Sequence, residues 1–305
     1  MNQCKKELFF VENLLYTRTV SVRRENHRRR SKTMNVQELE KHANNVRKNI
    51  LRAVYSAQSG HPGGSLSSAD VLTYLYFEVM DINADNVKGI DRDRFVLSKG
   101  HVTPALYSVF AEKGFLSEED ILTFRKFGSK LQGHPNMNYI DAVDMSTGSL
   151  GQGVSAAVGM ALANKLDKNG HHIYTLLGDG ECQEGEVWEA AMAASQYGLD
   201  NLTVMVDCNH LQIDGKVEDV MNVYPLDKKF EAFGFEVVKA NGHSFEAIKE
   251  AFDYAKSVKR KPTCILWNTV KGKGVSFMED QAGWHGSAPN EEQYKQAMKE
   301  LGGEE

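Results

Sequence analysis

The sequence predicts an α/β fold in which a parallel sheet carries helices on both faces. Short runs rich in β-branched residues alternate along the chain with longer stretches that repeat apolar residues at helical spacing. The short runs are apolar throughout, which is typical of strands buried on both faces of a parallel sheet. A content of 41% hydrophobic and 25% charged residues is ordinary for a chain that folds around a sizeable core.

The first expected element is a helix that begins near Val36. Apolar residues recur there at the spacing of one helix face, namely Val36, Leu39, Val46, Ile50 and Val54. We expect this helix to end near Ser59 and Gly60, because glycine readily takes the left-handed conformation that caps a helix.

The next elements are strands alternating with helices. The expected strands are RFVLS (94–98), HIYTLL (172–177), NLTVMVD (201–207), FEVVKA (235–240) and TCILWNTV (263–270). The expected helices cover 154–166, 186–198 and 245–258. A long loop with several glycines follows, from Lys271 to Pro289. In such sheets ligands bind beyond the carboxyl ends of the strands, so we expect the functional site at that edge.

Residues 34–305 are expected to form one α/β domain, preceded by a basic extension at 1–33. The extension holds nine Lys/Arg and three Glu, so the rest of the chain is more acidic than the net charge of -5 suggests. An acidic body argues against general nucleic-acid binding. We interpret the extension as disordered, or as lying upstream of a true start at Met34. Its run RRENHRRRSK is alternatively an import-like or nucleic-acid-binding tail.

Composition also bears on membranes and on the compartment. No window holds eighteen uninterrupted apolar residues, so we expect no membrane-spanning helix. The cysteines are too widely spaced to form metal-ligand pairs; they are Cys4, Cys182, Cys208 and Cys264. Free thiols of this kind favour a reducing compartment, and the expected location is the cytoplasm.

The ends of two expected strands carry a candidate metal site. Asp179 in LLGDG follows one strand and Asn209 follows the next, so the helix between them brings both to the same edge of the sheet. A carboxylate and an amide oxygen suit a hard cation such as Mg²⁺, and the flanking glycines let the backbone approach a phosphate. The alternative is an Asx turn followed by an unrelated strand end, which the spacing of the asparagine disfavours. Glu181 and Glu186 are interpreted as helix-start residues.

Four histidines lie in turns that contain glycine or proline: His61 in SGHPGG, His101 in SKGH, His134 in QGHP and His285 in GWHGSAP. A single histidine is more often a core or surface residue than a ligand, but four in such turns indicate loops that position functional side chains. Imidazoles bind phosphate and move protons near neutral pH. Their spacing matches no zinc motif, which disfavours a transition-metal cluster.

Two further segments are compatible with anion binding. STGSLGQG (146–153) opens an expected helix, as anion sites often do, although it has neither the P-loop ending nor the dinucleotide fingerprint. In the late loop, Lys271 and Lys273 are equally consistent with phosphate contact and with a solvated lid.

Taken in order, these motifs resemble the N-terminal, thiamine-diphosphate-binding half of transketolase. The segments that carry the resemblance are SGHPGGSLSSAD, LSKGH, GHP, STGSLGQG, GDGECQEGEVWEA, DCNHLQIDG and WHGSAP, spread between about Val36 and Pro289. GDG followed by a distant asparagine is shared by many thiamine-diphosphate enzymes. The histidine motifs and the glycine turn are more specific to transketolases.

The resemblance implies the thiamine-diphosphate-binding fold, here its diphosphate-binding domain, and a role for each motif residue. Mg²⁺ would be held by Asp179, Asn209 and the backbone carbonyl of Leu211. The cofactor would be contacted by His101, Gly148, Leu150, Gly180, Glu184, Asn209 and His285, of which Glu184 resembles the acid between the two active sites of the dimer. Substrate hydroxyls and proton transfers would fall to His61, His134 and His285. Cys208 and His210 stand where many members have other polar residues, which removes no implied ligand.

The resemblance also implies a partner. In the full-length family a second, pyrimidine-binding domain carries the glutamate that activates the cofactor and the arginines that grip the sugar phosphate. The chain leaves no room for it before Glu305, and KGKG (271–274) is more similar to split enzymes. We therefore expect a subunit that is inactive alone and forms an α2β2 assembly with a C-terminal subunit. Together they would pass a two-carbon ketol unit from a ketose (phosphate) to an aldose (phosphate), as in the pentose phosphate pathway.

Two alternatives stay open at this point. One is a thiamine-diphosphate synthase that uses pyruvate, of the 1-deoxyxylulose-5-phosphate type, against which the HPGG and WHGSAP motifs argue. The other is a non-catalytic, cofactor-binding relic, against which the retained Asp179, Asn209 and histidines argue.

Overall fold

The centre of the structure is a five-stranded parallel sheet, as predicted. The computed structural model describes residues 33–303. The strands are β1 (Arg94–Leu97), β2 (Ile173–Gly178), β3 (Leu202–Cys208), β6 (Glu236–Asn241) and β7 (Thr263–Asn268). Their order across the sheet is β1-β2-β3-β7-β6, and every pairing is parallel. Each strand lies within one or two residues of its predicted range.

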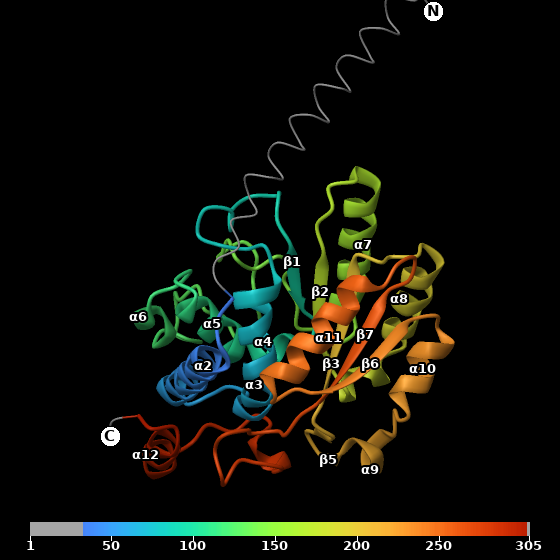
Figure 1. The fold of residues 1–305 in the computed structure, drawn as a ribbon. Helices are drawn as coiled ribbons and strands as arrows, with labels where there is room; N and C mark the ends of the chain where they lie inside the picture. Colours follow the sequence, from blue (N-terminus) through green and yellow to red (C-terminus); the bar gives the residue numbers. More distant parts are fainter. Residues whose placement is uncertain (1–32, 304–305) are drawn as a thin grey trace, which may run out of the picture. The chain divides into compact units, whose positions relative to one another are not determined.

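Helices cover both faces of the sheet (Figure 1). On one side α7 (Gln152–Asp167) and α8 (Gly185–Gln196) share a buried apolar cluster with β1, β2 and β3. On the other side α11 (Phe245–Ser257) packs on β6 and β7 and against α4 (Ala69–Tyr74). The predicted helices at 154–166, 186–198 and 245–258 are thereby confirmed. With both faces covered, β3 has no exposed residue, which explains its continuous apolar sequence.

The first helix, α2 (Val36–Ala57), is also confirmed, but its predicted cap is wrong. Gln58 takes the left-handed conformation after the helix, with φ 47°, and its amide donates to the Tyr55 carbonyl. Gly60 has φ +141°, outside that conformation, and a Cβ atom there would come within 2.9 Å of Val54 Cγ2. The glycine therefore provides close packing against α2, and the cap is provided by the glutamine.

Several short elements were not predicted. Most of them are too brief or too completely buried to show a periodic pattern, whereas the helix at 291–300 lies mostly at the surface behind a capping box and was missed. The helices among them are α3 (Pro62–Ser67), α4, η1 (Leu75–Val79), η2 (Gly100–Val102), α5 (Thr103–Glu112), α6 (Glu118–Ile121), η3 (Gly180–Gln183), α9 (Val217–Met221), α10 (Leu226–Ala232), η4 (Ala282–Trp284) and α12 (Glu291–Glu300). Strands β4 (Leu211–Gln212) and β5 (Gly215–Lys216) form a small hairpin. All six residues of α3 and of α4 are buried, so neither helix has a polar face to mark it in the sequence.

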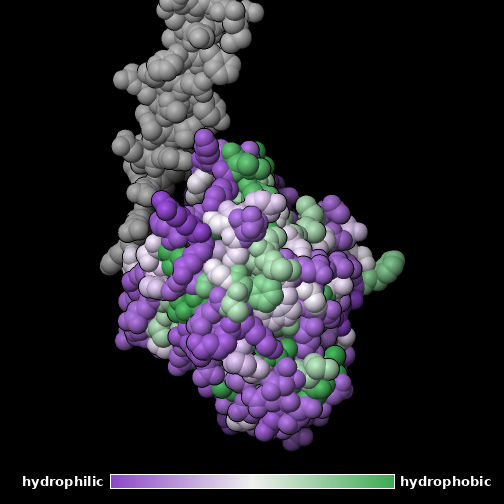
Figure 2. Space-filling view, turned by 90° about the vertical axis from the view of Figure 1, so that its right-hand side faces the viewer, coloured by the Kyte–Doolittle hydropathy of each residue, from purple (hydrophilic) through white to green (hydrophobic). Residues whose placement is uncertain are grey.

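The surface shown in Figure 2 is largely hydrophilic, with smaller separate areas of apolar side chains. Among residues 33–303, no helix combines the length and apolar character needed to cross a membrane. Cys182, Cys208 and Cys264 are buried free thiols. Cys4 and the expected basic extension, apart from Thr33, lie outside the described residues.

Candidate active site

Polar residues follow the carboxyl ends of neighbouring strands and meet at one edge of the sheet. Asp179 and Asn209 come directly after β2 and β3, Lys99 follows the end of β1 by two residues, and Lys271 follows the end of β7 by three. The parallel register keeps the ends of β2, β3 and β7 level with one another. In Figure 1 the segments that leave these ends, including β5 and the loop after β7, lie together on the lower side of the sheet.

Asp179 is 2% exposed, and its carboxylate accepts three hydrogen bonds. Oδ1 accepts from the amide of Gly180 at 2.8 Å. Oδ2 accepts from the amide of His210 at 2.7 Å and from the hydroxyl of Tyr224 at 2.8 Å. Burial raises the pKa of the Asp179 carboxyl, and the hydrogen bond from Tyr224 opposes that rise. Three hydrogen-bond donors around one carboxyl group suit its ionised form, which can only accept hydrogen bonds.

Asn209 lies at the same edge of the sheet as Asp179, on the turn after β3. The amide of His210 reaches Asp179, and the next amide, that of Leu211, donates to Asn209 Oδ1 at 3.1 Å. The orientation of the Asn209 side chain is set by Asp207, because Nδ2 donates to Asp207 Oδ2 at 2.8 Å. A carboxylate has no donor, so the amide oxygen of Asn209 must face away from Asp207.

Asp207, near the end of β3, connects this strand to three other segments of the chain at the site. It is buried and accepts from Lys99 Nζ at 2.5 Å and from Ser67 Oγ at 2.6 Å, besides a hydrogen bond from Thr269 Oγ1. Burial acts to raise the pKa of the Asp207 carboxyl, but the Lys99 ammonium and these hydrogen bonds outweigh it and hold the pKa below its ordinary value. A buried ion pair surrounded by hydrogen-bond donors holds its members in a fixed arrangement.

The two lysines of the late loop have different environments. Lys271 is 1% exposed, and its Nζ donates to the Leu211 carbonyl at 3.2 Å and to His285 Nδ1 at 2.8 Å. Burial lowers the pKa of Lys271 to about 8, and the nearby Lys99 charge acts in the same direction. Lys273 instead pairs with Glu279 at 3.1 Å, and its side chain is 37% exposed. Lys271 therefore belongs to the site, and Lys273 does not.

Three of the four predicted histidines form a cluster. The ring centroids of His61, His101 and His285 lie 5.1, 5.5 and 5.2 Å apart. Burial, reinforced by nearby cations, lowers the pKa of His61 to about 4, that of His285 to about 3, and that of His101 well below its ordinary value. The rings are therefore neutral at pH 7. Among the described residues, the buried Nδ1 of His61 has no hydrogen-bond partner, which leaves it available to a ligand.

His134, the fourth histidine, is exposed and lies beside the glycine-rich turn that precedes α7. A Cβ atom on Gly148, which has φ +150°, would lie 3.1 Å from His134 Cγ, and one on Gly100 would lie 2.8 Å from the Gly148 amide nitrogen. The turns that carry His101 and His134 therefore pack directly on the glycine-rich turn. Leu150 is half-buried in that turn, beside which lies a cavity of about 110 Å³.

The acids after Asp179 have three different environments. Glu181 lies in the first turn of η3, but it is buried and accepts from Ser98 Oγ at 2.5 Å, the Gly151 amide at 2.9 Å and the Gly178 amide at 3.0 Å. It therefore connects strand ends to the glycine-rich turn, a role that its interpretation as a helix-start residue missed. Glu184 is exposed at the start of α8, and Glu186 lies in the first turn of that helix.

Sequence reasoning also missed Asp207, Lys99 and Tyr224. Asp207 had a usable signal, because it is a charged residue inside an otherwise apolar strand. Lys99 lies within the motif that drew attention to His101. Tyr224 lies in a segment without any motif, and only the folded chain brings it to Asp179.

The donor set at this edge is made of oxygen atoms. Carboxylate, side-chain amide and backbone carbonyl oxygens come from Asp179, Asn209 and Leu211, and such ligands suit a hard cation. Within residues 33–303, no group of three or more His, Cys, Asp or Glu side chains is arranged to hold a metal ion. The residues present therefore fit a cation that also takes oxygens from a phosphate.

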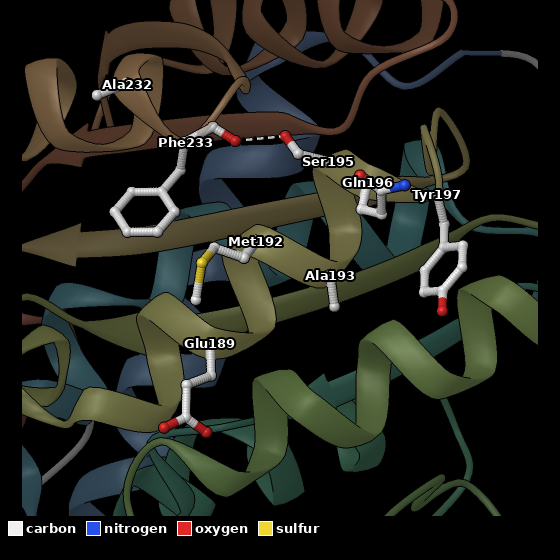
Figure 3. A pocket seen from close by; sticks show the side chains of 8 residues that line it. All are labelled: Glu189, Met192, Ala193, Ser195, Gln196, Tyr197, Ala232 and Phe233. Carbon is white, nitrogen blue, oxygen red and sulfur yellow. Dashed lines mark hydrogen bonds between the residues drawn. The ribbon is translucent and has the colours of Figure 1, made fainter.

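A large open groove, of about 890 Å³, is separate from this site (Figure 3). It runs along α8 and the end of α10 and is lined by Glu189, Met192, Ala193, Ser195, Gln196, Tyr197, Ala232 and Phe233. Ser195 Oγ already donates to the Phe233 carbonyl. None of the residues discussed above lines this groove, so the chemistry is assigned to the edge of the sheet and not to the groove.

The chain is similar to known proteins over most of its length. The family model described as "Transketolase, thiamine diphosphate binding domain" matches residues 39–305. The chain is 45% identical over 268 residues to an apulose-4-phosphate transketolase subunit of Phocaeicola vulgatus, covering 88% of this chain and 95% of that protein. It is also 45% identical over 264 residues to 6-deoxy-6-sulfo-D-fructose transketolase subunit SqwG of Clostridium sp. strain MSTE9, covering 87% and 96%.

Longer relatives match over part of their length. Human transketolase is 42% identical over 269 residues, which are 87% of this chain and 42% of the human protein. The crystal structure of transketolase from Campylobacter jejuni superposes with a TM-score of 0.84 at 39% identity, covering 89% of this chain and 44% of that one. The chain thus spans less than half the length of these two relatives.

Proposed function

The chain belongs to the transketolase family, through its N-terminal, thiamine-diphosphate-binding domain, and we propose that it is the N-terminal subunit of a split transketolase. In this proposal it binds thiamine diphosphate and Mg²⁺ and, with a C-terminal subunit, transfers a two-carbon ketol unit from a ketose (phosphate) to an aldose (phosphate). The proposal rests on how much of each relative's length this chain matches. Two relatives named as transketolase subunits are matched over 95% and 96% of their length, whereas human transketolase is matched over 42%.

The proposed metal ligands are Asp179, Asn209 and the backbone carbonyl of Leu211. Their support is that the turn after β3, which carries Asn209 and Leu211, is hydrogen-bonded to Asp179 after β2, with the Asn209 amide oxygen turned away from Asp207. Lys271 donates to the Leu211 carbonyl, so a positive charge already lies beside this oxygen-rich turn. We propose that a bound cation and the diphosphate share this region with Lys271.

The proposed diphosphate contacts are His101, Gly180 and His285, to which the buried Lys271 is now added. Lys271 Nζ holds His285 through Nδ1, so the neutral imidazole of His285 carries its proton on Nε2 and donates from there. Gly148 and Leu150 are proposed to line the rings of the cofactor. The small cavity beside the glycine-rich turn is lined by Gly148 and supports the assignment of that residue.

The proposed substrate contacts are His61, His134 and His285. When bound, thiamine diphosphate supplies the nucleophilic carbon and the electron sink that cleavage of a carbon–carbon bond requires. The histidines orient the sugar. Because the pKa values of all three are lowered, each ring is neutral near pH 7. His61 and His134 then offer one N–H donor and one nitrogen acceptor each, whereas His285, whose Nδ1 accepts from Lys271, offers its Nε2–H donor. Such groups hold hydroxyls and pass protons between them without carrying a charge themselves.

The proposed partner is a C-terminal subunit with the pyrimidine-binding domain, in an α2β2 assembly. Glu184 is exposed at the start of α8, which supports its proposed place at a contact between two active sites. The three buried free thiols are in keeping with the reducing conditions of the cytoplasm.

The proposal is tested by reconstitution. Ketol transfer from a ketose phosphate to an aldose phosphate is measured for the chain alone, for the candidate C-terminal partner alone and for the two mixed, each with thiamine diphosphate and Mg²⁺. Activity is expected only in the mixture, and it should be lost in a mixture containing Asp179→Ala. Full activity of the chain alone would show that the split-subunit proposal is wrong, and activity with pyruvate but not with ketose phosphates would replace it with a synthase.

A further inference from the structure

Tyr224 contacts the proposed metal ligand Asp179 from a part of the chain that carries no recognised motif. It lies between α9 and α10, is half-buried, and donates its hydroxyl hydrogen to Asp179 Oδ2 at 2.8 Å. The amide of His210 donates to the same oxygen at 2.7 Å. The other oxygen, Oδ1, accepts from the Gly180 amide at 2.8 Å.

These contacts determine which oxygen of Asp179 is available. An ionised carboxylate has about four lone-pair directions, two on each oxygen. Among the described residues, two donors reach Oδ2 and one reaches Oδ1. The lone-pair direction left without a donor is therefore on Oδ1, and a cation that approaches Asp179 meets that oxygen alone.

The position of the Tyr224 hydroxyl is itself fixed by packing. The Tyr224 ring stacks on the His210 ring, with centroids 5.0 Å apart and planes 23° from parallel. His210 has φ 62°, and this backbone conformation accompanies an amide that points at Asp179. The thiol of Cys208 also lies next to the Tyr224 hydroxyl. His210 and Cys208, which stand where many family members have other polar residues, thus both lie next to Tyr224.

We propose that Tyr224 is a positioning residue that makes Asp179 a one-oxygen ligand and thereby favours Mg²⁺ over Ca²⁺. The inference rests on the proposed function, because it requires Asp179 to hold the cation. Mg²⁺ demands an octahedron of single oxygens, whereas Ca²⁺ takes six to eight oxygens and accepts both oxygens of one carboxylate. Hydrogen bonds to a ligating carboxylate fix its orientation and so tune the metal that it binds.

The test compares the full-length chain with Tyr224→Phe, which removes the hydroxyl and keeps the ring stacked on His210. The dissociation constants of Mg²⁺ and Ca²⁺ are measured by calorimetric titration in the presence of thiamine diphosphate. With one direction on Oδ2 freed, Asp179 becomes able to bind through both oxygens. We expect the preference for Mg²⁺ over Ca²⁺, expressed as the ratio of the two constants, to fall about tenfold.

The matched control is Tyr254→Phe. Tyr254 on α11 also donates its hydroxyl to a carboxylate, Glu236 Oε1, at 2.7 Å, but away from the site. This variant should keep the wild-type ratio. A second variant, Tyr224→Leu, removes the hydroxyl through a different side chain, so it supplies the same comparison if the phenylalanine variant fails to fold.

The outcomes separate the inference from the proposed function. If Asp179→Ala no longer binds either ion while Tyr224→Phe keeps the wild-type ratio of the two dissociation constants, the metal site stands and the inference is overturned. If Tyr224→Phe loses affinity for Mg²⁺ and Ca²⁺ equally, the inference is overturned as well, since that result indicates a merely structural role. If Asp179→Ala still binds Mg²⁺ with unchanged affinity, the proposed metal site fails and the inference fails with it.

Discussion

Lys271 is buried between the Leu211 carbonyl and the His285 ring, and this placement makes its charge depend on pH. Burial lowers the pKa of the ammonium to about 8. A diphosphate bound beside it would favour the charged form and raise that pKa again. The free chain must therefore take up a proton on binding whenever the pH lies near or above 8. Above that pH the affinity for thiamine diphosphate is expected to fall.

Titration calorimetry at pH 8, in buffers with different ionisation enthalpies, measures this uptake. Near its pKa the lysine is half-protonated, so we expect binding to take up roughly half a proton. Lys271→Arg keeps the charge permanently and should abolish that contribution. Lys273→Arg is the matched control, because Lys273 pairs with Glu279 near the surface. Equal uptake by wild type and Lys271→Arg would contradict the assignment.

For single residues, the sequence indicates which residues belong to the site better than it indicates which other residues they contact. The spacing of Asp179 and Asn209 was sufficient to place both at one edge of the sheet, because parallel strand ends meet there. The three-way contact of His61, His101 and His285 agrees with their shared turn context. Tyr224 escaped notice because its role is a hydrogen bond across a long stretch of chain, which no local pattern encodes, whereas the charge of Asp207 inside a buried strand was a signal that was not used.

At the scale of elements, Glu181 connects the ends of β1 and β2 to the turn that opens α7. Its buried carboxylate accepts from Ser98, Gly151 and Gly178. The Gly151 amide lies directly before α7, in the same turn as Gly148 and Leu150. Loss of Glu181 would therefore leave two backbone amides without their acceptor and loosen the turn against the sheet.

We expect Glu181→Ala to lower the free energy of unfolding by about 1–3 kcal/mol for each amide left unpaired. Glu181→Gln keeps one acceptor oxygen but points an amide nitrogen at one of the donors, so a smaller loss is expected. Urea unfolding measures both. Glu186→Ala, in the first turn of α8, is the control and should change stability by less than about 0.5 kcal/mol. Equal stability of Glu181→Ala and the wild type would contradict this role.

The predicted strands and long helices were found because their patterns are regular. Most strands are largely apolar runs, although β6 also carries Glu236 and Lys239, and α2 and α11 each bury a stripe of one face. Short elements such as α3 and α4 could not be predicted, since every residue in them is buried and no polar face remains to set a period. The cap after α2 was predicted wrongly for a related reason. Gly60 was the better candidate because glycine readily takes the left-handed conformation, but in the structure it allows close packing against Val54 instead.

At the scale of the whole molecule, ligand binding and folding are linked. A ligand that binds only the folded chain stabilises it by about 2.7 kcal/mol at one hundred times its dissociation constant. Thiamine diphosphate with Mg²⁺ should therefore raise the midpoint of thermal unfolding by several degrees, and EDTA should reverse the rise. Asp179→Ala is expected to show no rise that depends on Mg²⁺. A shift that survives EDTA would argue against a cation at this edge.

The strand order has a consequence for the moment at which the site comes into being. β6 precedes β7 in the chain, yet within residues 33–303 its pairing in the sheet is with β7, which also pairs with β3. While the ribosome is still adding residues before Thr263, β6 has no strand to pair with, although it can pack on α10 and α11, and the open side of β3 is uncovered. Asp179 and Asn209 have left the ribosome by then, whereas Lys271 and His285 have not. The addition of β7 between β3 and β6 therefore closes the sheet late in biosynthesis, and the site is completed only by the segment after β7, which carries Lys271 and His285.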